Sequence, residues 1–290
     1  MLKIIIVILS FPVFYIYKFH IYTTFHRKIK ILNLIYHEKV VKRYDICHTG
    51  IGIYKEFKIM IRINDLKEKE KYILKYRIKD MFTKDMNPFI ELFFFKKNEH
   101  ICREDEELNY LFFLVKGKAK VYTTLSNGKS LLLCFYDDFK LLGDVEIINL
   151  ENASSDVQVI EDTYCLAISL KNVRLYLLND AKFLRFICSS LGGKLNRCSK
   201  NSSINLLYPL ENRLASYILA TGERVDNNEE IIIKFNENLT EMAELLGTSY
   251  RHLLRTLNNL SYKGAIRKKS NYFQVLDEKI LKKLAADLYK

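Results

Sequence analysis

The stretch from Asn238 to Leu260 constrains the fold most, because it has the pattern of two short helices joined by a tight turn. Asn238 is a favourable N-cap, and Glu241 follows three residues later, where its carboxylate can reach back to the cap. Gly247 stands where the first helix must end, a position that often needs a positive φ. Ser249 can cap the second helix. The pattern predicts a helix-turn-helix.

The second helix is predicted to bury a leucine stripe and to leave a polar face free. Its apolar positions recur three and four residues apart, at Leu253, Leu254, Leu257 and Leu260. Tyr250, Arg251 and Arg255 fall on the other faces, and such long side chains can reach base edges in a major groove. Ser249 and His252 are placed for phosphate contacts. An ordinary helical hairpin with solvated charges would show the same pattern.

The segment that follows favours nucleic-acid binding over an ordinary hairpin. Residues 265–275 hold two short apolar runs around a polar turn that contains Lys268 and Lys269. This arrangement predicts the wing of a winged helix, with a basic tip suited to a phosphate backbone. Helix, turn, helix and basic wing in this order predict DNA binding.

The net charge of +12 adds little to this prediction, because most of the excess lies elsewhere. Residues 1–60 carry ten Lys and Arg against three Asp and Glu, whereas residues 205–290 carry 13 against 11. The argument for DNA therefore depends on where individual charges are placed.

Residues 1–59 are an apolar and basic extension with three interpretations. The apolar run Ile4–Tyr17 is shorter than the roughly 20 residues that a bilayer span needs. Lys55-Glu56 can be encoded by a ribosome-binding sequence just before Met60, so we favour a misassigned translation start. A membrane anchor and a soluble extension remain the alternatives, and we expect a cytoplasmic protein without a membrane partner.

Residues 60–178 are predicted to form an effector-type β-roll preceded by helices. Charged, amphipathic sequence over 61–86 gives way to short β-type runs from residue 91 to residue 168, with a hairpin signal at Ser126-Asn127-Gly128. Strands at this spacing predict an antiparallel jelly roll, and the whole chain is expected to be α+β. His100 is the only histidine in this region, and the six cysteines are not clustered. We therefore expect no metal, no iron–sulfur cluster, no catalytic residue and no enzyme.

Residues 179–206 are predicted to form one long helix, followed by a DNA-binding domain over 207–290 that begins near Pro209. The helix is either a core helix on the barrel or a seam between two copies of the chain. The second interpretation assigns the seam to Leu184, Ile187, Leu191, Leu195 and Cys198. Gly192-Gly193 weakens such a helix unless close backbone approach requires it.

This order of elements resembles the CRP/FNR superfamily of bacterial transcription regulators over about residues 85–290. The motifs that carry the resemblance are Leu111–Gly117, Asn127-Gly128, Gly143-Asp144, Pro209–Ala215 and the helix-turn-helix with Arg255. Ser249–Arg255 is similar to the YeiL-type subgroup. The resemblance implies a homodimer, an N-terminal effector domain, a double-stranded DNA operator and contact with RNA polymerase.

Departures from the family pattern argue against cAMP as the effector. Family members that bind cAMP carry Gly-Glu and, about ten residues later, Arg-Ser. Here Gly143-Asp144 is followed by Ser154-Ser155, so the charged partner of the cyclic phosphate is missing from this candidate effector pocket. The clustered cysteines of oxygen-sensing relatives are missing too, which leaves the cofactor unknown.

In the second helix of the helix-turn-helix, Arg255 matches the guanine-reading arginine of the family. Arg251 stands where many members place a cytosine-reading Glu, so we expect a different base at that operator position. The resulting hypothesis is a homodimeric, sequence-specific transcription regulator. The alternative is a ligand-binding β-roll whose C-terminal domain binds a protein partner in place of DNA.

Overall fold

The computed structural model describes residues 40–42, 59–227, 230–235, 238–286 and 288–289, and the predictions made for residues 1–39 and 43–58 lie outside them. The chain divides into two compact units, 1–64 and 65–290. In the first unit, β1 (Val40–Lys42) pairs antiparallel with β2 (Ile59–Ile63). None of the helices in the described ranges is both long and apolar enough to cross a bilayer.

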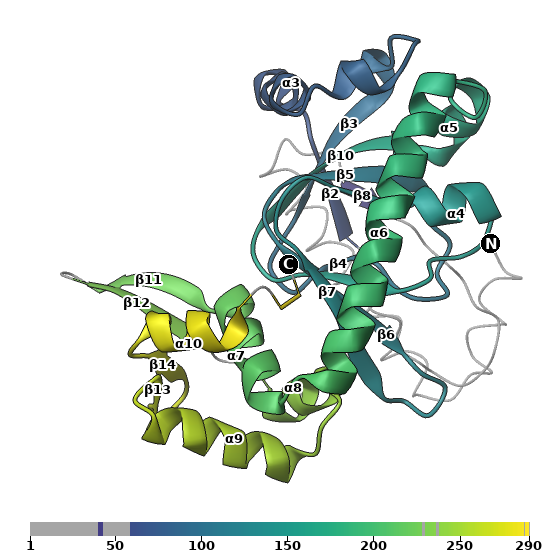
Figure 1. Cartoon of the computed structure of the whole chain (residues 1–290). Helices are drawn as coiled ribbons and strands as arrows, with labels where there is room; N and C mark the ends of the chain where they lie inside the picture. The colour runs from purple at the N-terminus through teal and green to yellow at the C-terminus, as the bar shows by residue number, and fades with distance from the viewer. Residues whose placement is uncertain (1–39, 43–58, 228–229, 236–237, 287, 290) are drawn as a thin grey trace, which may run out of the picture. The chain divides into compact units, whose positions relative to one another are not determined.

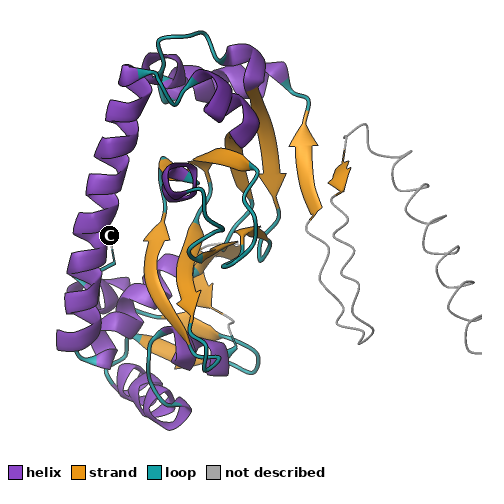
Figure 2. Ribbon diagram, turned by 90° about the vertical axis from the view of Figure 1, so that its right-hand side faces the viewer, coloured by secondary structure: helices purple, strands orange, loops and turns teal. Residues whose placement is uncertain are grey.

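The second unit contains the predicted β-roll, built from two antiparallel sheets (Figure 2). One sheet has the order β3 (Ile90–Phe95), β10 (Thr163–Ser169), β5 (Tyr110–Lys116) and β8 (Lys140–Leu142). The other has the order β4 (His100–Cys102), β9 (Asp156–Val159), β6 (Ala119–Thr124) and β7 (Ser130–Tyr136). The α+β class with a β-roll is therefore confirmed.

Local sequence accounts for the β6–β7 hairpin and for the buried strand β5. Gly128 adopts φ +78° in the hairpin between β6 and β7, and Leu125 N–H donates to the carbonyl of Lys129 at 2.8 Å across the turn. Residues Leu111–Val115 are all buried, because both faces of β5 are covered. Aromatic side chains fill this core, with Phe93 and Phe112 meeting edge to face at 6.1 Å between ring centroids.

Helices and short turns flank the β-roll. Before it come α3 (Leu66–Lys75) and the 3-10 turns Ile78–Met81 and Asn87–Phe89. Within and after it come α4 (Asp144–Asn149) and α5 (Leu170–Tyr176). The long helix α6 (Ala181–Leu207) then leads from the β-roll into α7 (Figure 1), and Asp180 caps its N-terminus by accepting from Lys182 N–H at 2.9 Å.

The C-terminal region is a winged helix. It contains α7 (Leu210–Thr221), β11 (Glu223–Asn227), β12 (Glu230–Phe235), α8 (Leu239–Leu245), α9 (Tyr250–Tyr262), β13 (Ile266–Lys268), β14 (Phe273–Val275) and α10 (Glu278–Ala285). Its antiparallel sheet has the order β11-β12-β14-β13. The predicted helix-turn-helix and wing are thus present, together with β11 and α10, which the sequence pattern did not predict.

One local prediction about this region was wrong. Glu241 was expected to return to the N-cap of α8, but its Oε1 accepts a hydrogen bond from Lys120 Nζ at 2.7 Å. Asn238 caps α8 without Glu241, because its side chain accepts a hydrogen bond from Thr240 N–H at 2.9 Å. The ammonium of Lys120 carries a full charge, so it is a stronger partner for the carboxylate than a backbone N–H.

Candidate nucleic-acid interface

Helix α9 is held in place by its leucine stripe. Leu253, Leu257 and Leu260 are at most 1 % exposed and face Met242 and Leu246 in one hydrophobic cluster. Ser249 begins the helix, with its Oγ accepting from His252 N–H at 3.2 Å. This burial leaves the opposite side of α9 directed outward.

The outward side of α9 carries the three predicted base-reading residues. Tyr250 is 47 % exposed, and Arg251 and Arg255 are both exposed. Arg251 and Arg255 are four residues apart and therefore share one helix face. Across the described residues, neither guanidinium is paired with a carboxylate. Both arginines are free to donate in pairs to acceptors such as O6 and N7 of guanine.

The turn between α8 and α9 fixes how this helix is presented. Gly247 adopts φ +59°, and its N–H donates to the carbonyl of Glu244 at 2.8 Å. Thr248 N–H donates to the carbonyl of Ala243 at 2.9 Å, which completes the turn. A left-handed residue is needed here, as the position of the glycine in the sequence predicted.

Two of the predicted phosphate contacts, Ser249 and His252, lie at the N-terminus of α9. His252 is exposed on the first turn of α9, and its Nδ1 lies 3.2 Å from the hydroxyl of Thr248, which directs Nε2 away from that turn. Ser249 is exposed at the N-terminus of α9. The N–H groups of a helix N-terminus also favour an anion such as phosphate.

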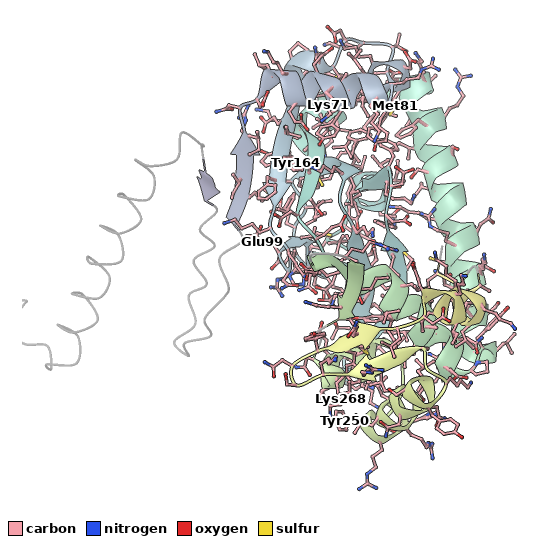
Figure 3. The ribbon with its side chains drawn as sticks, turned by 90° about the vertical axis from the view of Figure 1, so that its left-hand side faces the viewer. Lys71, Met81, Glu99, Tyr164, Tyr250 and Lys268 are labelled. Atoms are coloured by element: carbon pink, nitrogen blue, oxygen red, sulfur yellow. The ribbon has the colours of Figure 1, made fainter. Side chains whose placement is uncertain are left out.

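The wing supplies the remaining cations. Ile266 pairs with Val275 and Lys268 with Phe273, and Lys269 N–H closes the tip by donating to the carbonyl of Tyr272 at 2.8 Å. Lys268 and Lys269 are exposed. Figure 3 shows Tyr250 of α9 and Lys268 of β13 in the same lower part of the view.

Sequence reasoning did not single out one further exposed cation of the wing. Arg267 is exposed in β13, directly before Lys268. The alternation of a strand gave the signal, because a buried residue at Ile266 turns its neighbour outward.

The candidate effector pocket has internal partners for its carboxylates. Gly143 adopts φ +95° and places Asp144 at the start of α4, where the Asp144 side chain is fully buried. Its Oδ2 accepts from Ser190 Oγ at 2.9 Å, and its Oδ1 pairs with Lys194 Nζ. Both partners belong to α6.

Ser154 and Ser155 do not join Asp144. The N–H and Oγ of Ser154 donate to Glu146 at 3.1 and 3.2 Å, and the carbonyl of Ser155 accepts from Cys102 Sγ at 3.6 Å. An open hollow of ≈ 520 Å³ beside this loop is lined by Glu104, Asp105 and residues 150–154. Its carboxylates disfavour an anionic ligand.

The predicted dimer stripe is split between two faces of α6. Ile187 is 1 % exposed and packs inside the protomer, whereas Leu195 is 72 % exposed and Cys198 is exposed as well. Leu184 and Leu191 are half-buried. Leu195 and Cys198 are therefore available to a second copy, and Ile187 is not, because it is buried within the protomer.

Comparison with known proteins agrees with this architecture. The family model of the cyclic nucleotide-binding domain matches residues 92–180, and that of the Crp-like helix-turn-helix domain matches residues 212–284. The fold and the site thus define a regulator with a ligand-binding-type β-roll and a DNA-binding domain.

Two curated relatives narrow this class. The regulatory protein YeiL of Escherichia coli O157:H7 is 35 % identical over 210 residues, which covers 72 % of this chain and 92 % of the relative. A CRP-like cAMP-activated global transcriptional regulator of Mycobacterium tuberculosis is 20 % identical over 193 residues, covering 66 % of this chain and 86 % of the relative. The chain belongs to the CRP/FNR family and is a DNA-binding transcription regulator.

Solved structures show the same fold. A putative CRP/FNR-family regulator from Eubacterium rectale aligns with a TM-score of 0.58 at 14 % identity, over 69 % of this chain and 91 % of that chain. The CRP-family regulator TTHB099 from Thermus thermophilus aligns with a TM-score of 0.54 at 17 % identity, over 68 % and 98 % respectively.

Proposed function

We propose that the chain binds a two-fold symmetric DNA operator as a homodimer in the cytoplasm and controls transcription through RNA polymerase. The observation that carries this proposal is the exposed pair Arg251 and Arg255 on α9, whose leucines are locked inward. The dimer would form along α6, where Leu195 and Cys198 are exposed. Two α9 helices related by a two-fold axis would then enter successive major grooves, about 10 bp apart.

The groups on this surface would divide into base-reading residues and phosphate-binding residues. Arg255 would read guanine, and Arg251 would read a second base with its own donor pair. Ser249, His252, Lys268 and Lys269 would hold the phosphate backbone and set the register without reading sequence. Tyr250 would contact a base edge from the first turn of α9.

The effector would differ from cAMP. Within the protomer, Asp144 is already bound to Lys194 and Ser190, and Ser154 already donates a hydrogen bond to Glu146. A cyclic phosphate approaching the nearby loop would meet Glu104 and Asp105 in place of a guanidinium. Like charges there oppose binding.

Selection of bound sequences from a random DNA library by the purified full chain tests the function. We expect an inverted repeat whose half-site differs from the usual family half-site at the base facing Arg251. Binding should weaken steeply with salt. Failure to recover any salt-sensitive site would favour the alternative in which the C-terminal domain binds a protein.

A further inference from the structure

The middle of α6 contains two adjacent glycines that nothing inside the protomer requires. Gly192 and Gly193 lie near the centre of the 27-residue helix. A Cβ added at Gly192 would meet nothing within 4 Å, and one at Gly193 would meet only the guanidinium of Arg197, at 3.8 Å. Neither glycine adopts a positive φ. Since glycine is the weakest helix former after proline, this is the point at which α6 is easiest to bend.

Asp144 spans this weak point from outside the helix. Its Oδ2 accepts from Ser190 Oγ at 2.9 Å, and its Oδ1 pairs with Lys194 Nζ. Ser190 and Lys194 are four residues apart, so they are neighbours on successive turns of one helix face. The double glycine lies between them in sequence. A single carboxylate thus joins the turn before the glycines to the turn after them.

The carboxylate is firmly anchored on the β-roll side. Asp144 is 0 % exposed, and its position follows from Gly143, where a Cβ would lie 2.7 Å from the side chain of Leu108. Ile147 N–H donates to the carbonyl of Gly143 at 3.1 Å and closes the first turn of α4. Because Asp144 is buried and its backbone position is set by Gly143, a change in the position of α4 would be passed to α6 through Asp144.

The two halves of α6 have independent contacts with the β-roll. Before the glycines, Phe186 stacks on Phe113 of β5 with 6.4 Å between the ring centroids. After them, Asn201 Nδ2 donates to the carbonyl of Leu133 at 2.6 Å, and Ile204 is 3 % exposed. Each half can therefore stay packed while the angle between the halves changes at residues 192–193.

We propose that Gly192-Gly193 is a joint at which α6 can bend. The carboxylate of Asp144 holds α6 straight across this joint, and Lys194 is the counter-ion of that carboxylate. Because Lys194 pairs with Asp144 from within the chain, α6 is held straight without an external ligand. An effector that bound Asp144 would have to displace Lys194 and would release the joint. The link from this joint to operator binding depends on the proposed function, but the joint itself does not.

Hydrogen exchange measured by mass spectrometry on the full chain tests whether Asp144 holds α6 straight at the joint. Asp144→Asn keeps an acceptor for Ser190 but loses the charge that holds Lys194. We expect amide exchange over residues 190–197 to rise about tenfold, while exchange over α9 stays unchanged. Asp144→Asn/Lys194→Met removes both charges and should give the same rise without leaving an unpaired buried ion. If Asp144→Asn folds poorly, Ser190→Ala removes one arm only and should raise exchange about threefold.

The matched rescue replaces the joint. Gly192→Ala/Gly193→Ala should slow exchange in this stretch, and adding it to Asp144→Asn should restore protection to within about threefold of the native chain. Unchanged exchange in Asp144→Asn, or no rescue by the alanines, would overturn the proposal. So would loss of the dimer in the alanine variant by sedimentation, because the glycines would then serve close approach between copies. If the native chain binds no DNA, the proposed function fails while this test still stands.

Discussion

Lys120 of β6 and Glu241 of α8 form an ion pair between the β-roll and the helix-turn-helix, with 2.7 Å between Nζ and Oε1. The side chain of Lys120 is 6 % exposed, whereas that of Glu241 is 48 % exposed. The buried cation therefore belongs to the β-roll, and its carboxylate is supplied by the DNA-binding region. Leu132 and Phe135 of β7 join the hydrophobic cluster of that region beside the pair.

Glu241→Ala should destabilise the chain, because it leaves the ammonium of Lys120 buried without its carboxylate. We expect a loss of about 1–3 kcal/mol in the free energy of unfolding, toward the lower end because Glu241 is half in solvent. Urea denaturation of the purified variant measures this loss.

The control for this pair is Lys120→Met/Glu241→Ala, which removes the charge together with its partner. It should recover most of the lost stability, since an apolar side chain replaces a buried ion. If the two residues do not act as a pair, Lys120→Met should lower the stability of the Glu241→Ala variant by as much as it lowers that of the native chain. That result would contradict the prediction.

The sequence predicted the winged helix because its signals are local. A capping residue, a left-handed glycine and leucines at helical spacing defined α8 and α9, and Gly247 does adopt a positive φ. By contrast, α4, α5 and α10 are as short as α8, at six to eight residues, and no glycine follows them to mark where the helix ends. Strand β8 has three residues and is defined by its pairing with β5.

Local sequence patterns could not predict the contacts between segments that are far apart in the chain. Asp144 and Lys194 are 50 residues apart, and Lys120 and Glu241 are 121 apart. The stripe assigned to the dimer seam also mixed two faces. Ile187 and Leu195 both fit helical spacing, but the folded protomer buries Ile187 and leaves Leu195 exposed. Residue spacing identifies an apolar stripe, whereas tertiary packing determines which surface covers that stripe.

Arg251→Ala should relax operator specificity at one position of each half-site. The guanidinium is exposed on α9 and shares its face with Arg255, so losing it removes one donor pair without disturbing the leucine core. We expect discrimination at that base to fall by about 1–3 kcal/mol. Competition binding with operators mutated at each position checks this.

Arg255→Ala is the matched comparison for this prediction, since it should relax a different position. Equal weakening on every sequence in both variants would mean that the two arginines contact phosphate only.

Lys268→Ala and Lys269→Ala should weaken binding to all DNA sequences alike. Both lysines are exposed at the tip of the wing, where they can neutralise phosphates. Each should lower the slope of log affinity against log salt by about one. Fluorescence anisotropy over a salt series measures it, with Lys171→Ala, an exposed lysine of α5, as the control that should leave the slope unchanged.

Asp180 should make the stability of the chain depend on pH in the acid range. Burial by itself raises the pKa of this carboxyl, but hydrogen bonds outweigh it and hold the pKa below its usual range. The donors are Thr83 N–H at 2.6 Å, Thr83 Oγ1 at 2.9 Å, and the N–H groups of Lys182 and Phe183 in the first turn of α6. The ionised form is therefore favoured by folding.

The sign of the effect follows from that lowered pKa. Its contribution is fully present above the ordinary aspartate pKa of about 4 and is lost as pH falls through the lower value of the folded chain. At neutral pH, Asp180→Ala should cost about 0.5–2 kcal/mol from the lost cap alone. As pH falls below about 4, the stability gap between the native chain and the variant should narrow in urea denaturation. A gap that stays constant down to the acid limit would show that Asp180 acts without its charge, and Asp180→Asn, which keeps a capping oxygen, should then match the native chain at every pH.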